Sequence, residues 1–291
     1  MVEKVWDIKV HSNPDCIVSI ENGYLIGTYE LNEETRVKTG SILAMVEMEE
    51  KNRMILDKGI MDIKKIDQTS FLASTSEGGI VIFSGENLEI KADSVIHDFC
   101  TSYISISDGI CWISYLDGTV SAVDINTLQT LYSIKPNAYE IWSIFASENE
   151  VYIPTSIGKL EIWDKRLENS AYKLNIHTED ICSIGISDNC IITGSYDGDL
   201  AFLDKRTYQI IEKLHIGGGI WRFINTDSYI ACACMYEGYK FYWKASKEIS
   251  TIPTSSIAYG LDQISPTSFI GCSFYDREVS KLTLKTVFNS T

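Results

Sequence analysis

The feature that most constrains this chain is a repeat in its β-rich segments. An apolar residue that opens such a segment returns every 36 to 45 residues, at Ile60, Ile96, Ile141, Ile181, Ile220 and Ile257. This period is typical of the four-stranded blade of a β-propeller, because one blade cannot cover its own sheet and must stack on its neighbours. The repeat therefore predicts an all-β propeller, and the sequence shows no sustained helical pattern that opposes it.

Turn residues support the repeat. An acidic residue followed by glycine suits a tight hairpin turn, and such a pair stands between two β-rich runs in four repeats, at 76–79, 116–118, 196–198 and 236–238. Two further marks close third strands in successive repeats, Trp163-Asp164-Lys165-Arg166 and Leu203-Asp204-Lys205-Arg206. Together these marks resemble the WD40 repeat, most clearly in the repeats that open at Ile141 and Ile181.

The blade count reaches seven. Blade 1 is expected from Cys16 to Asp57, with a charged insertion from Asn32 to Lys38. The others are expected to start near Lys58, Asp93, Ala138, Thr178, Gly217 and Ser255. Blade 7 holds only three strand-like runs, whereas residues 2–10 have strand character and no partner. We therefore predict that the N-terminal strand completes blade 7, and that residues 1–291 form a single domain, because closure removes exposed sheet edges.

Composition narrows the classes of partner. The formal net charge is -15, which disfavours binding to nucleic acid because phosphates are repelled. No apolar run approaches the roughly 20 residues of a membrane helix, and the first residues lack the apolar stretch of a secretory signal. The eight cysteines form no CxxC pair. They are expected to be buried, reduced thiols, so the sequence predicts a cytoplasmic protein without membrane association.

Candidate functional residues gather on one predicted face of the ring. Trp142, Cys182, Trp221, His97 and Tyr259 share one aligned register, one residue after the isoleucine, or for Tyr259 the alanine, that opens each inner strand. Other side chains are expected on the same face, namely Glu140, His177, Tyr196, Arg222 and Tyr275. An aromatic and acidic mouth favours an alkylammonium group, since ring faces attract cations.

Structural roles compete with functional ones at each of these positions. His177 lies 20 residues before Asp197, a pairing in WD repeats that commonly serves only to hold the turn. The tryptophans either bind a ligand or plug the channel, and a buried Arg222 would need an acidic partner, for which Glu140 and Asp98 are candidates. The nucleophile elbow, the phosphate-binding glycine loops and HExxH are missing from the sequence, so neither a cofactor nor a metal is expected.

Blades 5 to 7 carry motifs beyond the generic repeat. They include Gly218-Gly219-Ile220-Trp221-Arg222, the run from Ala233 to Lys240, and Cys272-Ser273-Phe274-Tyr275-Asp276. With His177-Thr178, the runs 182–184 and 193–197, and Ser256-Ile257-Ala258-Tyr259-Gly260, they resemble the diphthine methylesterases, a WD-repeat family of diphthamide biosynthesis. Gly27-Thr28-Tyr29-Glu30-Leu31 and Glu140-Ile141-Trp142 add to the likeness, which extends over roughly residues 16 to 284.

The resemblance implies a carboxylic ester hydrolase that removes the methyl ester from methylated diphthine on elongation factor 2. That modified histidine carries a trimethylammonium group next to the ester. Trp142, Trp221, Tyr259, Tyr196 and Tyr275 would then bind the substrate, with Glu140 adding negative charge.

For the chemistry, the resemblance leaves the roles open. His177 is the candidate general base. Arg222 or the backbone amides of the glycine run are the candidate oxyanion donors. Cys182, activated by His177, is the alternative nucleophile. A monomer is expected. Two other functions stay open: a non-catalytic scaffold and a reader of methylated ammonium groups.

Overall fold

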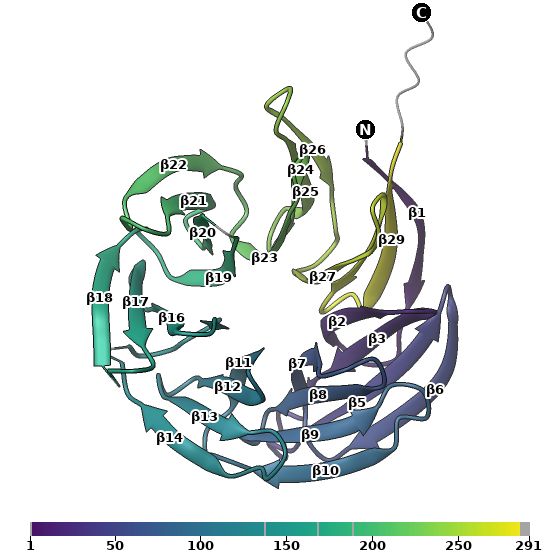
Figure 1. Ribbon diagram of the computed structural model, residues 1–291. Helices are drawn as coiled ribbons and strands as arrows, with labels where there is room; N and C mark the ends of the chain where they lie inside the picture. Colours follow the sequence, from purple (N-terminus) through teal and green to yellow (C-terminus); the bar gives the residue numbers. More distant parts are fainter. Residues whose placement is uncertain (1, 137, 168, 188, 286–291) are drawn as a thin grey trace, which may run out of the picture.

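The computed structural model describes residues 2–136, 138–167, 169–187 and 189–285, and it is a seven-bladed β-propeller (Figure 1). Seven antiparallel sheets stand around a central axis, and the chain runs around the ring in sequence order. In the residues described, no helix is long and apolar enough to cross a bilayer. The predicted all-β class and blade count are confirmed.

Each blade is a meander that begins at the axis and ends at the rim. The strands of the first four blades are β2 (Pro14–Ile20), β3 (Gly23–Thr28), β4 (Glu30–Leu31), β5 (Lys38–Val46) and β6 (Glu49–Leu56); β7 (Ile60–Lys65), β8 (Ser70–Thr75), β9 (Gly79–Ser84) and β10 (Ile90–Val95); β11 (Thr101–Ser107), β12 (Ile110–Tyr115), β13 (Val120–Asp124) and β14 (Thr130–Ile134); and β15 (Phe145–Ala146), β16 (Glu150–Thr155), β17 (Lys159–Asp164) and β18 (Asn169–Asn175). In blade 1 the short β4 pairs with β5, where the charged insertion was expected.

The last three blades follow the same plan. Their strands are β19 (Ile181–Ile186), β20 (Cys190–Ser195), β21 (Asp199–Asp204) and β22 (Ile210–His215); β23 (Ile220–Asn225), β24 (Tyr229–Cys234), β25 (Gly238–Trp243) and β26 (Glu248–Ile252); and β27 (Ala258–Ser265), β28 (Ser268–Ser273) and β29 (Glu278–Leu284). The acidic-glycine turns have the left-handed backbone that glycine allows, with φ of 79° at Gly118 and 82° at Gly198.

The two ends of the chain close the ring. β1 (Val2–Lys9) runs antiparallel to β29, from Val2 opposite Leu284 to Lys9 opposite Glu278. It is therefore the outer strand of blade 7, and it lies beside β29 in Figure 1. The predicted closure by the N-terminal strand is confirmed, and β29 is not left as an exposed sheet edge.

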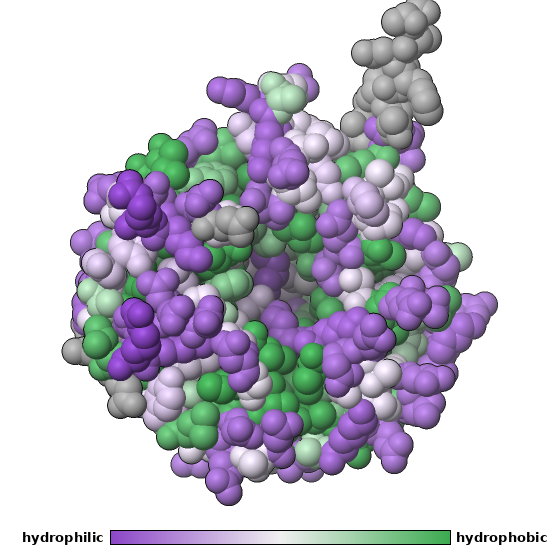
Figure 2. All heavy atoms as spheres, in the orientation of Figure 1, coloured by the Kyte–Doolittle hydropathy of each residue, from purple (hydrophilic) through white to green (hydrophobic). Residues whose placement is uncertain are grey.

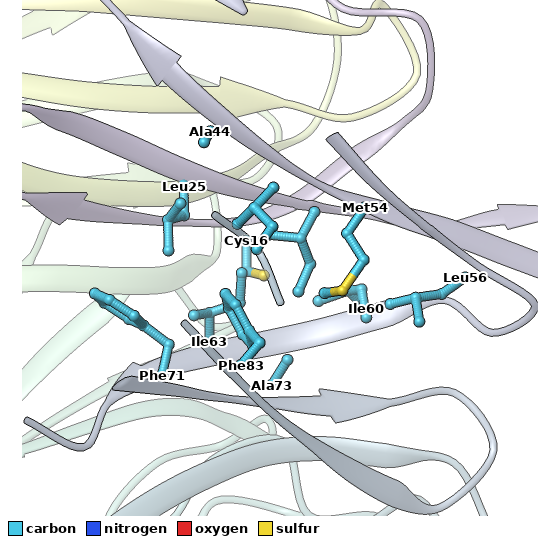
Figure 3. Packing of buried hydrophobic residues seen from close by; sticks show 12 residues of the cluster. Cys16, Leu25, Ala44, Met54, Leu56, Ile60, Ile63, Phe71, Ala73 and Phe83 are labelled. Carbon is cyan, nitrogen blue, oxygen red and sulfur yellow. The ribbon is translucent and has the colours of Figure 1, made fainter. Parts of the chain in front are cut away.

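Apolar clusters fill the space between neighbouring blades. Seven such clusters occur in the described chain, one at each blade interface. Between blades 1 and 2, Leu25 packs among Phe71, Phe83, Ile63 and Cys16 (Figure 3). Burying one such Leu or Phe side chain contributes roughly 1.5–3 kcal/mol, so the blades are held mainly by their shared faces.

Every long inner strand carries a β-bulge near its start. The register shifts by one residue between Pro14 and Cys16, and equivalent shifts follow the first residue of β7, β11, β19, β23 and β27. A bulge leaves one residue outside the ladder and redirects its side chain. The bulged residues therefore form a set of their own at the mouth of the channel.

The start of blade 3 differs from the prediction. Asp93 belongs to β10, the outer strand of blade 2, and Ile96 lies in the following loop. The inner strand opens instead at Thr101, whose buried hydroxyl donates to the carbonyl of Thr75 at 2.8 Å. Because a hydrogen bond replaces the apolar contact made by isoleucine in other blades, the apolar pattern does not mark this position.

Candidate active site

The bulged residues form a ring at one end of the central channel. They are Asp15, Met61, Ser102, Cys182, Trp221 and Tyr259. In blade 4, Trp142 directly follows Ile141 and joins this group, because its ring lies 5.4 Å from that of Trp221. The predicted register is thus right for four residues, but His97 is wrong: Ser102 is the member from blade 3.

Blades 4 to 7 make the aromatic half of this mouth. The Trp221 ring lies at its centre, with centroids 5.4 Å from Trp142, 5.0 Å from Tyr259 and 6.2 Å from Tyr196. Trp221 is only 8% exposed, whereas the other three rings are half-buried. The mouth therefore presents aromatic surface to solvent around one nearly buried indole, and the predicted grouping of these four residues is found.

Three glycines just before β23 determine where the Trp221 side chain lies. Gly217, Gly218 and Gly219 all have left-handed backbones, with φ of 85°, 75° and 72°. A Cβ at Gly218 would lie 2.8 Å from the Cβ of Glu237, so a side chain there meets both strain and a clash. The glycine run thus lets the chain turn sharply and enter β23 with Trp221 at the mouth.

Arg222 follows Trp221 and lines the channel. Its guanidinium carbon lies 5.2 Å from the Trp221 ring centre and 4.4 Å from that of Tyr103, and Nη1 donates to the Trp221 carbonyl at 2.7 Å. Neither of the acidic partners suggested by the sequence occupies the cavity that Arg222 lines; Asp15 and Asp62 do. The prediction of Glu140 or Asp98 as the acidic partner is therefore wrong. The acids that share the cavity with Arg222 are Asp15 from blade 1 and Asp62 from blade 2.

A cavity of about 270 Å³ joins these groups. It is walled by β2, β7, β11, β23 and β27, and its polar lining includes Asp15, Asp62, Lys64, Tyr103 and Arg222. Figure 2 shows the ring hollowed at its centre, with hydrophilic atoms inside. The volume is below the roughly 300–1,000 Å³ of a drug-sized site, so it suits the head of one side chain.

Asp15 is the acidic member of the bulge ring. Burial raises the pKa of its carboxyl to about 7, against the lowering effect of Arg222 and with a further rise from Asp62. Among the described residues, no hydrogen bond to this carboxylate is found. A carboxyl group with a pKa near neutrality, facing a cavity with a fixed cation, is a typical feature of catalytic sites.

The second acid of the cavity, Asp62, is paired with a lysine. Asp62 accepts hydrogen bonds from Lys64 at 3.1 Å and from the backbone amide of Ile104 at 3.2 Å. Burial alone would lower the pKa of Lys64, but Asp62 and Tyr103 outweigh it, so the pKa is raised and the amine stays charged. Asp62 and Lys64 therefore form a paired wall, whereas Asp15 and Arg222 face the open space.

His177 holds a turn. Its Nδ1 lies 3.1 Å from Asp197, its Nε2 lies 2.9 Å from the hydroxyl of Thr193, and its side chain is 0% exposed. Burial lowers the pKa of His177, partly offset by Asp197. With both nitrogens engaged and no solvent access, the ring is placed for the structural alternative rather than for proton transfer to a substrate.

Cys182 is enclosed beside the aromatic residues. Its side chain packs against Trp221 and Met235, and its sulfur lies 3.5 Å from the Asp180 carbonyl. Burial raises the pKa of the thiol well above its ordinary value, opposed only in part by Arg222. Because the thiolate is the nucleophile, this environment disfavours Cys182 as the attacking group. All eight cysteines are free, six buried and two half-buried.

Two predicted binding residues lie in loops outside the cavity. Tyr275 is 70% exposed and packs edge-on against Phe274, with centroids 5.0 Å apart. Glu140 is exposed before β15 and bonds to Ser156 through its backbone amide. Neither residue lines the cavity, so the predicted substrate-binding role of both stays a prediction.

Asp15 was missed by sequence reasoning. The sequence predicts the start of blade 1 at Cys16, whereas β2 starts at Pro14, a proline where most other blades have an isoleucine. The signal was nevertheless present: aligning Gly27-Thr28 with Gly194-Ser195 places Pro14 opposite Thr28 as Ile181 stands opposite Ser195. In that alignment, Asp15 corresponds to Cys182 and Trp221.

Comparison with known proteins agrees with the blade motifs. A Schizosaccharomyces pombe protein named diphthine methyltransferase is 24% identical over 89% of this chain and 90% of its own length. A Saccharomyces cerevisiae protein of the same name is 23% identical over 94% and 96%. The chain resembles the diphthine methyltransferases. The resemblance to WD-repeat proteins of diphthamide biosynthesis is thus confirmed along nearly the whole chain.

Two further comparisons concern the fold. No protein-family model matches the chain. A chain in the crystal structure of a mitotic checkpoint complex superposes with a TM-score of 0.80, covering 97% of this chain and 92% of that one. Its sequence identity is 9%, so the likeness is one of fold alone.

Proposed function

We propose that this chain acts in diphthamide biosynthesis as a methylesterase, hydrolysing the methyl ester of methylated diphthine on elongation factor 2 in the cytoplasm. The observation that carries the proposal is the junction at β23. There Trp221 centres an aromatic cluster, and Arg222, the next residue, lines a polar cavity. A substrate with a trimethylammonium group next to an ester has matching chemistry.

The aromatic half suits the cation. Trp142, Tyr196 and Tyr259 are half-buried around Trp221, and ring faces attract alkylammonium groups by about 0.5–2 kcal/mol each. Asp15, from the neighbouring position of the bulge ring, adds a carboxylate close enough to raise the pKa of Tyr259 together with burial. It takes the part that the sequence suggested for Glu140.

Arg222 suits the ester. Hydrolysis builds negative charge on the carbonyl oxygen, and a fixed donor in a cavity stabilises that charge without moving. The guanidinium is held between the rings of Tyr103 and Trp221 and by the Trp221 carbonyl. It also fits the product, since hydrolysis leaves a carboxylate.

The relatives' name suggests a second function, transfer of a methyl group to diphthine. One experiment separates the two. Purified full-length protein is mixed with elongation factor 2 carrying either methyl-esterified or unesterified diphthine, and the modified peptide is followed by mass. Methylesterase activity removes the ester methyl group and releases methanol from the first sample. A gain of methyl on the second, only when a methyl donor is added, would support transfer instead.

Binding without chemistry is the third outcome. A scaffold or a reader of methylated ammonium groups would retain the factor but leave its mass unchanged at micromolar protein. Binding that is lost on Trp221→Ala, with no methanol released by the wild-type protein, would assign the mouth to recognition and contradict the esterase proposal.

A further inference from the structure

The polar half of the mouth suggests where the water is activated. Asp15 belongs to the same bulge ring as Trp221 and Tyr259, and it also lines the cavity that Arg222 enters. Asp15 is thus shared by the aromatic mouth and the charged cavity. A carboxylate in this position can reach a water molecule beside an ester whose cation rests on the aromatic rings.

We propose that Asp15 is the general base of the reaction and that Arg222 is its electrostatic partner and oxyanion donor, so that hydrolysis takes place in the channel cavity beneath Trp221. This inference rests on the proposed methylesterase function and deepens it. It assigns the chemistry to blades 1 and 6, and not to His177 or Cys182.

The reaction balances with these groups and water alone. The Asp15 carboxylate takes a proton from water as the water oxygen bonds to the ester carbon, and the carbonyl electrons move onto the oxygen facing Arg222. The intermediate collapses, the bond between carbon and methoxy oxygen breaks, and the proton on Asp15 passes to the leaving group. Methanol and the free acid result, and the acid loses its proton to solvent.

Other acids of the cavity are less available. Asp62 is paired with Lys64, and Asp262 accepts the backbone amide and hydroxyl of Ser19 at 2.6 and 2.7 Å. The Asp15 carboxylate has no such partner among the described residues. A base must keep a free lone pair until the substrate arrives, and Asp15 meets this condition.

The groups around Asp15 set its pH dependence. The charged and phenolic groups that line the cavity or lie near Asp15 are Arg222, Asp62, Lys64, Lys65, Asp262, Tyr103 and Tyr259. Tyr29 and the thiols of Cys16, Cys100 and Cys272 also feel its charge, and burial raises the pKa of each of these four groups, so they stay neutral near pH 7. Of these neighbours, Arg222 is the one that lowers the pKa of Asp15.

The decisive experiment measures methanol release by full-length wild-type, Asp15→Asn and Asp93→Asn proteins on methyl-esterified elongation factor 2. Loss of a general base lowers kcat by roughly 100- to 10,000-fold, and we expect this for Asp15→Asn with KM changed less than kcat. Asp93→Asn, which removes an exposed acid on the outer strand β10 away from the cavity, should keep near-wild-type kcat. Thermal melting of each variant reports whether it is folded.

A pH profile adds a readout that a structural role would not produce. In wild-type protein kcat/KM should rise with pH through about 7 as Asp15 ionises. Arg222→Gln should lower kcat and also move the inflection to higher pH, because the guanidinium lowers the pKa of Asp15. Near-wild-type turnover by folded Asp15→Asn would overturn the inference and leave the methylesterase function standing. An inactive wild-type protein would overturn both.

Discussion

The two halves of the propeller mouth are built from the same structural position but carry opposite chemistry. Blades 4 to 7 place Trp142, Cys182, Trp221 and Tyr259 at the ring, whereas blades 1 to 3 place Asp15, Met61 and Ser102 there. A propeller repeats its backbone while leaving each blade free to choose the side chain at a given position. Under the proposed function, the aromatic half binds the cation, and Asp15 of the other half acts together with Arg222 from blade 6.

Removing the central indole should have the largest effect on recognition. Trp221→Ala should raise KM about 30-fold, which corresponds to roughly 2 kcal/mol of lost cation–ring attraction. Steady-state kinetics of methanol release checks this. Trp163→Ala is the matched control, because Trp163 is a half-buried tryptophan beside another cavity at the junction of blades 3 and 4. If both variants change KM equally, the aromatic half does not bind the cation.

Two histidine–aspartate pairs at equivalent positions, His177–Asp197 and His97–Asp117, test whether His177 is catalytic. His177→Ala leaves Asp197 and Thr193 without their buried partner, so we expect a loss of about 3 kcal/mol in the free energy of unfolding and little change in kcat. In blade 3, His97 makes the equivalent contact with Asp117 at 3.2 Å, but its side chain is 28% exposed.

His97→Ala should therefore cost less, about 1 kcal/mol. Urea unfolding and initial rates, measured on the same samples, give both quantities. A folded His177→Ala protein with kcat reduced 100-fold would restore the general-base role to this residue.

The three glycines before Trp221 set the position of its ring, and a substitution among them tests this role. Gly218→Ala should lower the free energy of unfolding by roughly 1–2 kcal/mol from left-handed strain, with a further loss from the clash with Glu237. Gly109→Ala is the control, because Gly109 has the same φ of 75° but open space around it. Only Gly218→Ala should also raise KM, since it displaces Trp221. An equal change in KM for both variants would show that the glycine run does not position Trp221 for substrate binding.

The polar half can be tested through the dependence of stability on pH. The pKa of Asp15 is raised on folding, from roughly 4 to about 7, so the native state holds a proton that the unfolded state has released. Asp15 therefore favours the folded state below pH 4, and this contribution is lost as pH rises to about 7. Relative to Asp15→Asn, wild-type protein should become less stable over that range, as thermal melting would show. A difference independent of pH would contradict the raised pKa.

Sequence and structure agree best where apolar periodicity decides the outcome. The blade count, the closure by residues 2–9 and the aromatic grouping follow from repeats of isoleucine, turn glycines and strand patterns, which are local signals. Thr101 breaks the pattern because a hydrogen bond takes the place of an apolar contact. Asp15 is a harder case, because its proposed role depends on sharing a cavity with Arg222. Arg222 is more than 200 residues away in the sequence, so no local pattern brings the two residues together.

The pairing of β1 with β29 also has a consequence for how the protein is made. Blade 1 leaves the ribosome first and blade 7 last, so the seam between them forms only once the whole chain has emerged. Asp15 and Tyr259 lie on either side of that seam, and an unfinished or truncated chain would hold them apart. Under the proposed function, the site would therefore be complete only after β1 has paired with β29.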